Sequence, residues 1–245
     1  MDTQRLSQTV QPLLAWYRAH ARVLPWRADR EPYHVWLSEI MLQQTRVEAV
    51  RGYYLRFLER LPDIAALASA PEDVLLKLWE GLGYYSRVRN LQKAAQCVME
   101  QHGGEFPQEL SAIRALPGIG DYTAGAIASI CFEEPAAAVD GNVLRVILRL
   151  TACADSPADV RVRRRIGESL SAIYPAGHCG DFTQALMELG ATVCLPNGAP
   201  QCEVCPLRSL CEAHAQGTEL QFPTKPPKKP RRIEQRTDLR AVQQQ

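Results

Sequence analysis

Apolar residues recur at helical spacing along most of the chain. One amphipathic stripe near its start consists of Leu6, Val10, Leu13, Leu14 and Tyr17. A denser apolar run predicts a helix over residues 35–45, and Pro71 followed by two acidic residues is typical of a first helical turn. The same spacing predicts further helices over residues 86–101, 108–115, 121–131, 142–152, 159–173, 181–193 and 206–215. We find no convincing run of strict alternation, so the predicted fold class is all-α.

The pattern changes at Gly217. Residues 217–245 are rich in Pro, Lys, Arg and Gln, which is typical of a linker or flexible tail. They hold seven Lys/Arg against three acidic residues, a net charge of +4, whereas the whole chain carries +1 and the remainder therefore about −3. Binding to nucleic acid cannot be argued from bulk charge here and would need a local basic patch or backbone amide contacts.

The composition is that of an ordinary globular protein. Its 245 residues, 46% of them hydrophobic and 22% charged, are enough for one large or two small domains with a core. The first residues contain no apolar run of signal-peptide length, and charged residues interrupt every long apolar stretch. We therefore expect no secretion signal, no membrane-spanning helix and a cytoplasmic location.

Half of the cysteines lie within eighteen residues. They are Cys194, Cys202, Cys205 and Cys211, and four such thiolates suit either a tetrahedral zinc ion or a four-iron four-sulfur cluster. The alternative is a set of buried cysteines or two disulfides, which a chain of intracellular character disfavours. The spacing alone does not separate zinc from iron–sulfur.

A glycine hairpin lies between two predicted helices. In Leu116-Pro-Gly-Ile-Gly120, two glycines two positions apart leave backbone N–H groups unshielded, just before the positive end of a helix that starts near Asp121. Such an arrangement, formed here by Leu116, Gly118 and Gly120, binds a phosphate oxygen without reading sequence. The hairpin on its own could equally be an ordinary corner between helices.

Several motifs together resemble one family. Leu116-Pro-Gly-Ile-Gly120, Val139-Asp-Gly-Asn-Val143 and the four cysteines resemble the helix–hairpin–helix base-excision DNA glycosylases. Within that superfamily, Trp36-Leu-Ser-Glu-Ile-Met-Leu-Gln-Gln-Thr45 and Gly81-Leu-Gly-Tyr-Tyr-Ser-Arg87 resemble the MutY-type adenine DNA glycosylases, and the resemblance covers roughly residues 10–232.

The resemblance implies a two-lobed fold with DNA in the cleft between the lobes. It places a six-helix barrel with the helix–hairpin–helix at 25–131, an iron–sulfur domain at 1–24 plus 132–216, and a basic Pro-rich tail at 217–245. It also favours one 4Fe-4S cluster over zinc. The family usually has six residues between its first two cluster cysteines, whereas seven separate Cys194 from Cys202 here.

Two carboxyl groups could serve the chemistry of base removal, which needs an acid for the departing base and a carboxylate for the sugar cation. Glu39 lies in an apolar helical run where burial would raise its pKa; the alternative is a solvent-facing helix residue. Asp140 occupies the position of a helix N-cap, and this role by itself would explain an aspartate there. By resemblance, Glu39 protonates adenine and activates water, Asp140 stabilises or traps the oxocarbenium carbon, and Asn142 supports Asp140.

Tyr122 separates two reaction types. Bifunctional enzymes of the endonuclease III type carry at this position a lysine that forms a Schiff base with the sugar. No lysine lies between Lys93 and Lys225, so a monofunctional hydrolytic glycosylase is favoured. By resemblance Tyr122 bonds near the catalytic carboxylates, although an aromatic residue early in a helix is common.

Other residues are assigned to DNA by the resemblance. Gln44 and Tyr84 match residues that probe the helix and wedge into the duplex, with Thr45 nearby, although Tyr84 could instead pack with Tyr85. The residues matched to the adenine pocket are Trp26, Arg27 and Gln184. The expected partner is double-stranded DNA with adenine opposite 8-oxoguanine or guanine, and we expect a monomer.

The family's second domain, a Nudix-like fold that recognises 8-oxoguanine, is expected to be absent or nearly so. Poor discrimination between 8-oxoguanine and guanine would follow. Two rival functions stay open: an endonuclease III-like glycosylase and lyase, and a non-catalytic iron–sulfur module that binds DNA.

Overall fold

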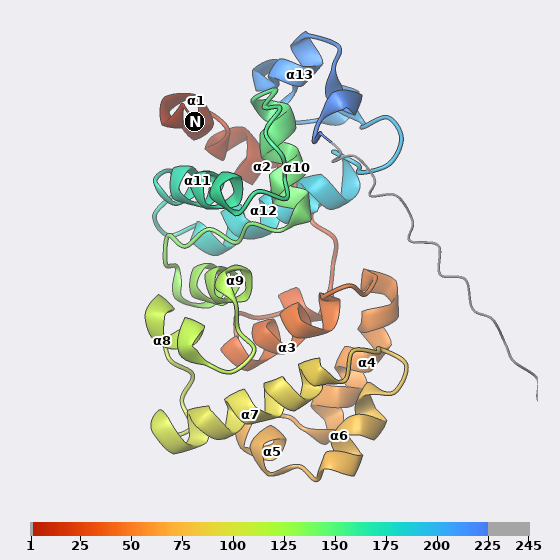
Figure 1. Cartoon of the computed structure of the whole chain (residues 1–245), viewed down its shortest axis with the longest axis vertical. Helices are drawn as coiled ribbons and strands as arrows, with labels where there is room; N and C mark the ends of the chain where they lie inside the picture. Colours follow the sequence, from red (N-terminus) through yellow and green to blue (C-terminus); the bar gives the residue numbers. More distant parts are fainter. Residues whose placement is uncertain (1, 225–245) are drawn as a thin grey trace, which may run out of the picture.

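The computed structural model describes residues 2–224, and the predicted tail beyond Thr224 lies outside them. Every regular element in that range is helical, so the all-α prediction is confirmed. The elements form two lobes joined by the segment that follows α2 and by the segment between α9 and α10 (Figure 1). No helix among these residues is long and apolar enough to cross a membrane.

The first lobe consists of α3 (Pro32–Leu42), α4 (Val47–Arg60), α5 (Ile64–Ser69), α6 (Glu72–Trp79), α7 (Ser86–Gln101), α8 (Leu110–Ala115) and α9 (Asp121–Phe132). One continuous apolar core, from Leu24 to Ala138, fills it. At its centre lies α3, with eight of its eleven residues buried. A helix that is apolar on almost every side is stable only when it is surrounded, which is why α3 packs against α4, α7 and α9.

The second lobe consists of α1 (Thr3–Ser7), α2 (Val10–His20), α10 (Gly141–Leu150), α11 (Val160–Ser171), α12 (Cys179–Thr192) and α13 (Glu212–Ala215). A separate apolar core joins the N-terminal stripe to residues between Val139 and Leu207. The helix α12 packs on α2 and α10 within this lobe and on α9 of the first lobe, so it spans the junction (Figure 1).

Several boundaries differ from the sequence-based expectation. The helices α4 and α5 were not among the predicted segments, although Val50, Tyr54 and Phe57 on α4 have the spacing of a buried helical face. The segment predicted as one helix over 206–215 is two short pieces, η3 (Arg208–Leu210) and α13, interrupted at Cys211.

The start of the predicted tail is folded. Residues 217–224 include the turn η4 (Glu219–Gln221). Arg149 donates from Nε to the carbonyl oxygen of Phe222 at 2.9 Å, and the Thr224 hydroxyl donates to the carbonyl of Ala154 at 3.1 Å. These contacts hold the chain against the second lobe up to Thr224. The buried Arg149 side chain needs carbonyl acceptors, and the sequence pattern did not reveal that Phe222 supplies one of them.

Candidate active site and metal centre

A pocket of about 370 Å³ lies at the junction of the two lobes. Its walls come from α3, α9, α10, α12 and the segment around the 3-10 turn η1 (Pro25–Arg27). Nine residues singled out from the sequence line it: Trp26, Arg27, Glu39, Gln44, Thr45, Tyr122, Asp140, Asn142 and Gln184. Helices far apart in sequence thus bring both carboxyl groups to one cavity.

Glu39 is the buried acid of the pocket. It is 8% exposed on α3, and burial raises its pKa to about 7, assisted by the charge of Asp140 and opposed by the bond from Tyr122 and by Arg27. The Tyr122 hydroxyl donates to Oε2 of Glu39 at 2.7 Å. No hydrogen bond to Oε1 is found among the described residues, so this oxygen is free to present a proton to the pocket near neutral pH.

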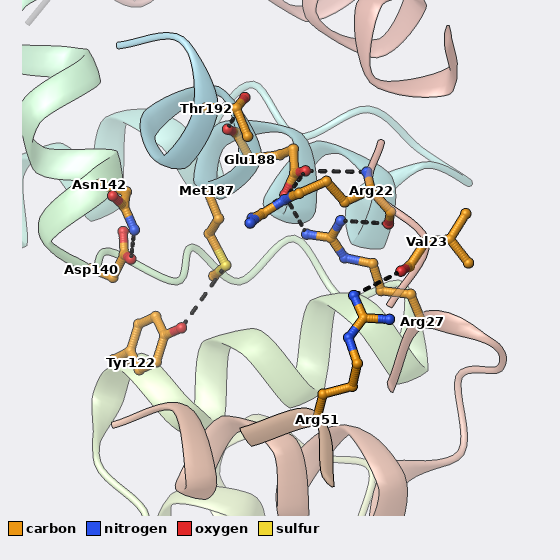
Figure 2. A network of polar contacts seen from close by, with 10 residues as sticks. All are labelled: Arg22, Val23, Arg27, Arg51, Tyr122, Asp140, Asn142, Met187, Glu188 and Thr192. Carbon is orange, nitrogen blue, oxygen red and sulfur yellow. Dashed lines mark hydrogen bonds and ion pairs between the residues drawn. The ribbon is translucent and has the colours of Figure 1, made fainter. Parts of the chain in front are cut away.

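Tyr122 stays protonated in this environment. Burial, followed by the charges of Glu39 and Asp140, raises the pKa of its hydroxyl well above the ordinary value. Its oxygen also lies 3.9 Å from Sδ of Met187, which belongs to α12 (Figure 2). Tyr122 therefore acts as a fixed donor that orients the carboxyl group of Glu39 from the neighbouring helix.

Asp140 is the N-cap residue of α10. Its Oδ1 accepts from the backbone N–H of Val143 at 2.7 Å. Its Oδ2 accepts from Nδ2 of Asn142 at 2.8 Å, a contact drawn in Figure 2. Burial raises the pKa of Asp140 above its ordinary value, and these hydrogen bonds and the charge of Arg145 oppose the rise without cancelling it. Both oxygens are thus held in fixed directions at the positive end of a helix, whose N–H groups and dipole act in favour of the carboxylate against burial.

Arg145 connects Asp140 to the cysteine loop. It donates from NH2 to Oδ1 of Asn142 at 2.8 Å and from Nε to the carbonyl oxygen of Cys194 at 2.7 Å. Close packing of α10 on α12 permits this, because a Cβ on Gly190 would lie 2.5 Å from Cβ of Asn142. No sequence pattern distinguished Arg145, because it stands in an ordinary amphipathic helix.

Two loops of the first lobe carry the residues assigned to DNA. Gln44 and Tyr84 both have positive φ, 58° and 48°, although neither is glycine. Such backbone strain occurs preferentially at functional sites. Tyr84 is 62% exposed and Tyr85 38%, so neither ring is buried as the alternative of a packed Tyr84–Tyr85 pair would require. Tyr84 lies outside the pocket, whereas Gln44 and Thr45 line it.

Arg87 fastens these two loops together. Its NH1 donates to the carbonyls of Ile40 at 2.8 Å and Gln43 at 2.6 Å, at the C-terminal end of α3. Its NH2 donates to the carbonyl of Leu82 at 3.0 Å. The last carbonyls of a helix have no intrahelical partner and need such a donor. The helix α3 ends at Leu42, before the predicted residue 45, because the backbone leaves the helical region at Gln43 (ψ 116°) and Gln44 has a positive φ.

Replacing Arg87 with Leu is expected to lower the free energy of unfolding by about 2–4 kcal/mol, because several partly buried carbonyls lose their donor at once. Urea denaturation followed by circular dichroism measures the change. Arg89→Leu is the matched control. It removes an exposed ion pair with Glu72 and should change stability by less than about 0.5 kcal/mol. Equal effects of the two substitutions would contradict the structural role given to Arg87.

The glycine hairpin adopts the expected turn. Gly118 has φ +77°, and a Cβ there would lie 2.7 Å from Cβ of Asn90. Gly120 is the N-cap of α9 and is exposed, and a Cβ on it would meet nothing within 4 Å. Leu116 is buried and anchors the turn. The N-terminal amides of α9 at Gly120 are therefore open to an anion.

The four cysteines of the C-terminal run are free thiols that line one pocket in the second lobe. Burial raises the pKa of Cys202 to about 11 and that of Cys205 to about 12. Arg149 donates from NH1 to Sγ of Cys194 at 3.3 Å. Four sulfurs around one apolar space, with a cation on one of them, fit a group that binds thiolates.

Two further side chains border the sulfur pocket. His214 Nδ1 lies 2.6 Å from Oε1 of Glu219, and this oxygen lies 3.7 Å from Sγ of Cys202. Ligand atoms of these three residues lie within 4.8 Å of one another. The histidine and the carboxylate bond to each other, so the four-cysteine set remains the donor set that the arrangement favours.

Comparison with known proteins places these features in a family. Residues 37–172 match the family described as HhH-GPD superfamily base excision DNA repair protein. The chain is 46% identical over 211 residues to the adenine DNA glycosylase of Mus musculus, covering 82% of this chain and 41% of that protein. It is 40% identical over 220 residues to that of Buchnera aphidicola subsp. Baizongia pistaciae, covering 89% of this chain and 62% of that protein. The chain thus spans less than two thirds of each of these relatives.

Solved structures agree on the fold. A thermostable thymine-DNA glycosylase is similar with a TM-score of 0.78 and 28% identity, over 87% of this chain and 98% of that chain. A non-covalent endonuclease III–DNA complex is similar with a TM-score of 0.73 and 23% identity, over 89% of this chain and 98% of that chain. The second likeness concerns the fold alone.

Proposed function

The chain belongs to the HhH-GPD superfamily of base excision DNA repair proteins, and from that premise we propose that it is a monofunctional glycosylase that removes adenine mispaired with 8-oxoguanine or guanine. The observation that carries the proposal is the convergence of Glu39, Tyr122 and Asp140 on one pocket. The similarity to adenine DNA glycosylases supports adenine as the base. The tyrosine at position 122 and the absence of lysine between Lys93 and Lys225 support hydrolysis without a Schiff base.

In the proposed reaction the bond between C1′ of the sugar and the base nitrogen breaks, and its electron pair goes to the base. Glu39, half-protonated at about pH 7, donates its proton to the departing base. The Asp140 carboxylate stabilises the positive charge that develops on the sugar. Glu39, now ionised, then accepts a proton from the water that attacks C1′.

We propose that DNA binds in the cleft between a barrel at 25–131 and a domain made of 1–24 and 132–216. The amides at Gly118 and Gly120 would contact a phosphate, and Tyr84 and Gln44 would enter the duplex as the adenine is flipped out. The exposure of Tyr84 and the strained backbone at both residues support this role. Trp26, Arg27 and Gln184 would contact the flipped base.

We further propose that Cys194, Cys202, Cys205 and Cys211 hold a 4Fe-4S cluster. Bound there, such a cluster would cross-link the loop from Cys194 to Cys211, and its chemistry would be structural. The fit of four free thiols around one pocket supports it. Determination of iron, sulfide and zinc in the purified protein tests the assignment, and stoichiometric zinc without iron would overturn it.

The activity test is single-turnover excision on duplexes with one central mispair. We expect adenine release opposite 8-oxoguanine and guanine, strand cleavage only after alkali, and no covalent trapping by borohydride. A duplex with thymine opposite guanine is the control, because a thymine-DNA glycosylase shares the fold. Cleavage without alkali would favour a lyase, and release of no base from any duplex would favour a DNA-binding module.

A further inference from the structure

A single buried carboxylate binds two arginines at the wall of the pocket. Glu188, 1% exposed on α12, accepts at Oε1 from Nε of Arg22 at 2.6 Å and at Oε2 from NH2 of Arg22 at 2.9 Å. The same Oε2 accepts from NH2 of Arg27 at 2.8 Å. Burial alone would raise the pKa of Glu188, but the bonds from the two arginines outweigh it and lower the pKa. Figure 2 shows both guanidinium groups directed at this carboxylate.

Further contacts fix the orientation of Arg27. Its NH1 donates to the carbonyl oxygen of Arg22 at 3.3 Å, and its guanidinium carbon lies 5.6 Å from the ring centre of Tyr17. Its side chain is 15% exposed, against 37% for Arg22. The contacts seen among residues 2–224 use two of the five N–H groups of Arg27, and the residue lines the pocket.

We propose that Glu188 is a positioning residue that holds the Arg27 guanidinium at the pocket wall, so that its remaining N–H groups face the acceptor edge of a flipped purine. This inference rests on the proposed function. A planar guanidinium held in one orientation can discriminate between base edges, whereas a guanidinium that rotates freely cannot. Without Glu188, Arg27 would lose its only anionic partner among the described residues and would be free to turn toward solvent.

The competing role is purely structural. Arg22 also donates its backbone N–H to Oε1 of Glu188 at 3.1 Å, so the carboxylate ties the segment between the lobes to α12. If that tie were the whole function, the loss of Glu188 would harm the protein regardless of what stands at position 27. If Glu188 acts through Arg27, its loss should matter little once Arg27 is gone.

A double-mutant cycle separates the two roles. Single-turnover excision of adenine is measured for the full chain, for Glu188→Gln, for Arg27→Met and for the double variant. We expect Glu188→Gln to slow excision at least about tenfold in the wild-type background but less than about twofold in the Arg27→Met background. Equal loss in both backgrounds would overturn the proposal.

DNA binding supplies a second measurement. A purely structural effect of Glu188 on the lobes would weaken binding to every duplex equally. We expect Glu188→Gln to weaken binding to a duplex with a non-hydrolysable adenine nucleotide while leaving binding to a duplex with an abasic analogue within about twofold, because the analogue offers Arg27 no base. Equal weakening for both duplexes would contradict the positioning role.

Glu133→Gln is the matched control. Glu133 also pairs with an arginine across the junction, Arg30, and accepts from the backbone N–H of Cys179, but it does not line the pocket. The Glu133→Gln substitution should leave both the excision rate and DNA binding unchanged.

If Glu188→Gln does not fold, Glu188→Asp replaces it in the double-mutant cycle, because aspartate keeps the charge but has a shorter side chain. A wild-type chain that excises no base at all overturns the proposed function together with this inference, whereas normal excision with an unaffected Glu188→Gln overturns the inference alone.

Discussion

Replacing Glu39 with Gln is expected to slow adenine excision by about 10²–10⁴-fold at pH 7, because the amide retains the shape of the carboxyl group but has no proton to give. The Tyr122 hydroxyl can still donate to the amide oxygen, so the geometry of the pocket is preserved. Single-turnover rates on a duplex with adenine opposite 8-oxoguanine measure the loss. A variant that excises at the wild-type rate would remove Glu39 from the mechanism.

The pH dependence follows from the same residue. Since burial raises the pKa of Glu39 to about 7, excision by the wild-type chain should fall as the pH rises above about 7 and the protonated form is lost. This alkaline limb should be missing from the residual activity of Glu39→Gln. A wild-type rate that is flat between pH 6 and about pH 9 would contradict the assignment of Glu39 as the acid.

The melting temperature of Glu39→Gln shows whether its lost activity comes from the missing proton or from unfolding. The folded-state pKa of Glu39, about 7, exceeds its ordinary value of 4.5, so the neutral form favours folding and this contribution disappears as the pH rises through about 7. Above that pH a buried carboxylate opposes folding, and glutamine does not. Glu39→Gln should therefore melt at the same temperature as the wild-type chain or higher at alkaline pH. A lower melting temperature would instead attribute the lost activity to unfolding.

Replacing Asp140 with Asn is expected to slow excision by at least about 10²–10³-fold while the fold is retained. Asparagine caps helices about as well as aspartate, so the bond to the N–H of Val143 and the start of α10 should survive. What disappears is the negative charge that faces the sugar cation. The same single-turnover assay and a thermal melt measure the two effects separately.

Asp159→Asn is the matched control for Asp140. Asp159 is also an N-cap, accepting from the backbone N–H of Arg161 at 2.9 Å at the start of α11, but it lies outside the pocket. It should leave excision unchanged. If Asp140→Asn lost activity only in proportion to a lowered melting temperature, Asp140 would be a cap and nothing more.

Local patterns were sufficient for most helices. The helix predicted over 86–101 is Ser86–Gln101, and that over 121–131 is Asp121–Phe132. The segment Val47–Arg60 was missed even though its buried residues have helical spacing. The break at Cys211 was not foreseen, because local spacing does not show that this residue is extended and lines the sulfur pocket.

The sequence by itself determined the helical class, the capping position of Asp140, the turn at Gly118 and the number of thiols, since each depends on neighbours a few residues away. Only the tertiary structure decided that Glu39 is buried against Tyr122, which lies 83 residues further along the chain. It alone joined Glu188 to Arg22 and Arg27, at separations of 166 and 161 residues. The physical reason is that burial and ion pairing across helices depend on how apolar faces pack, and a pKa or a guanidinium orientation follows from that packing.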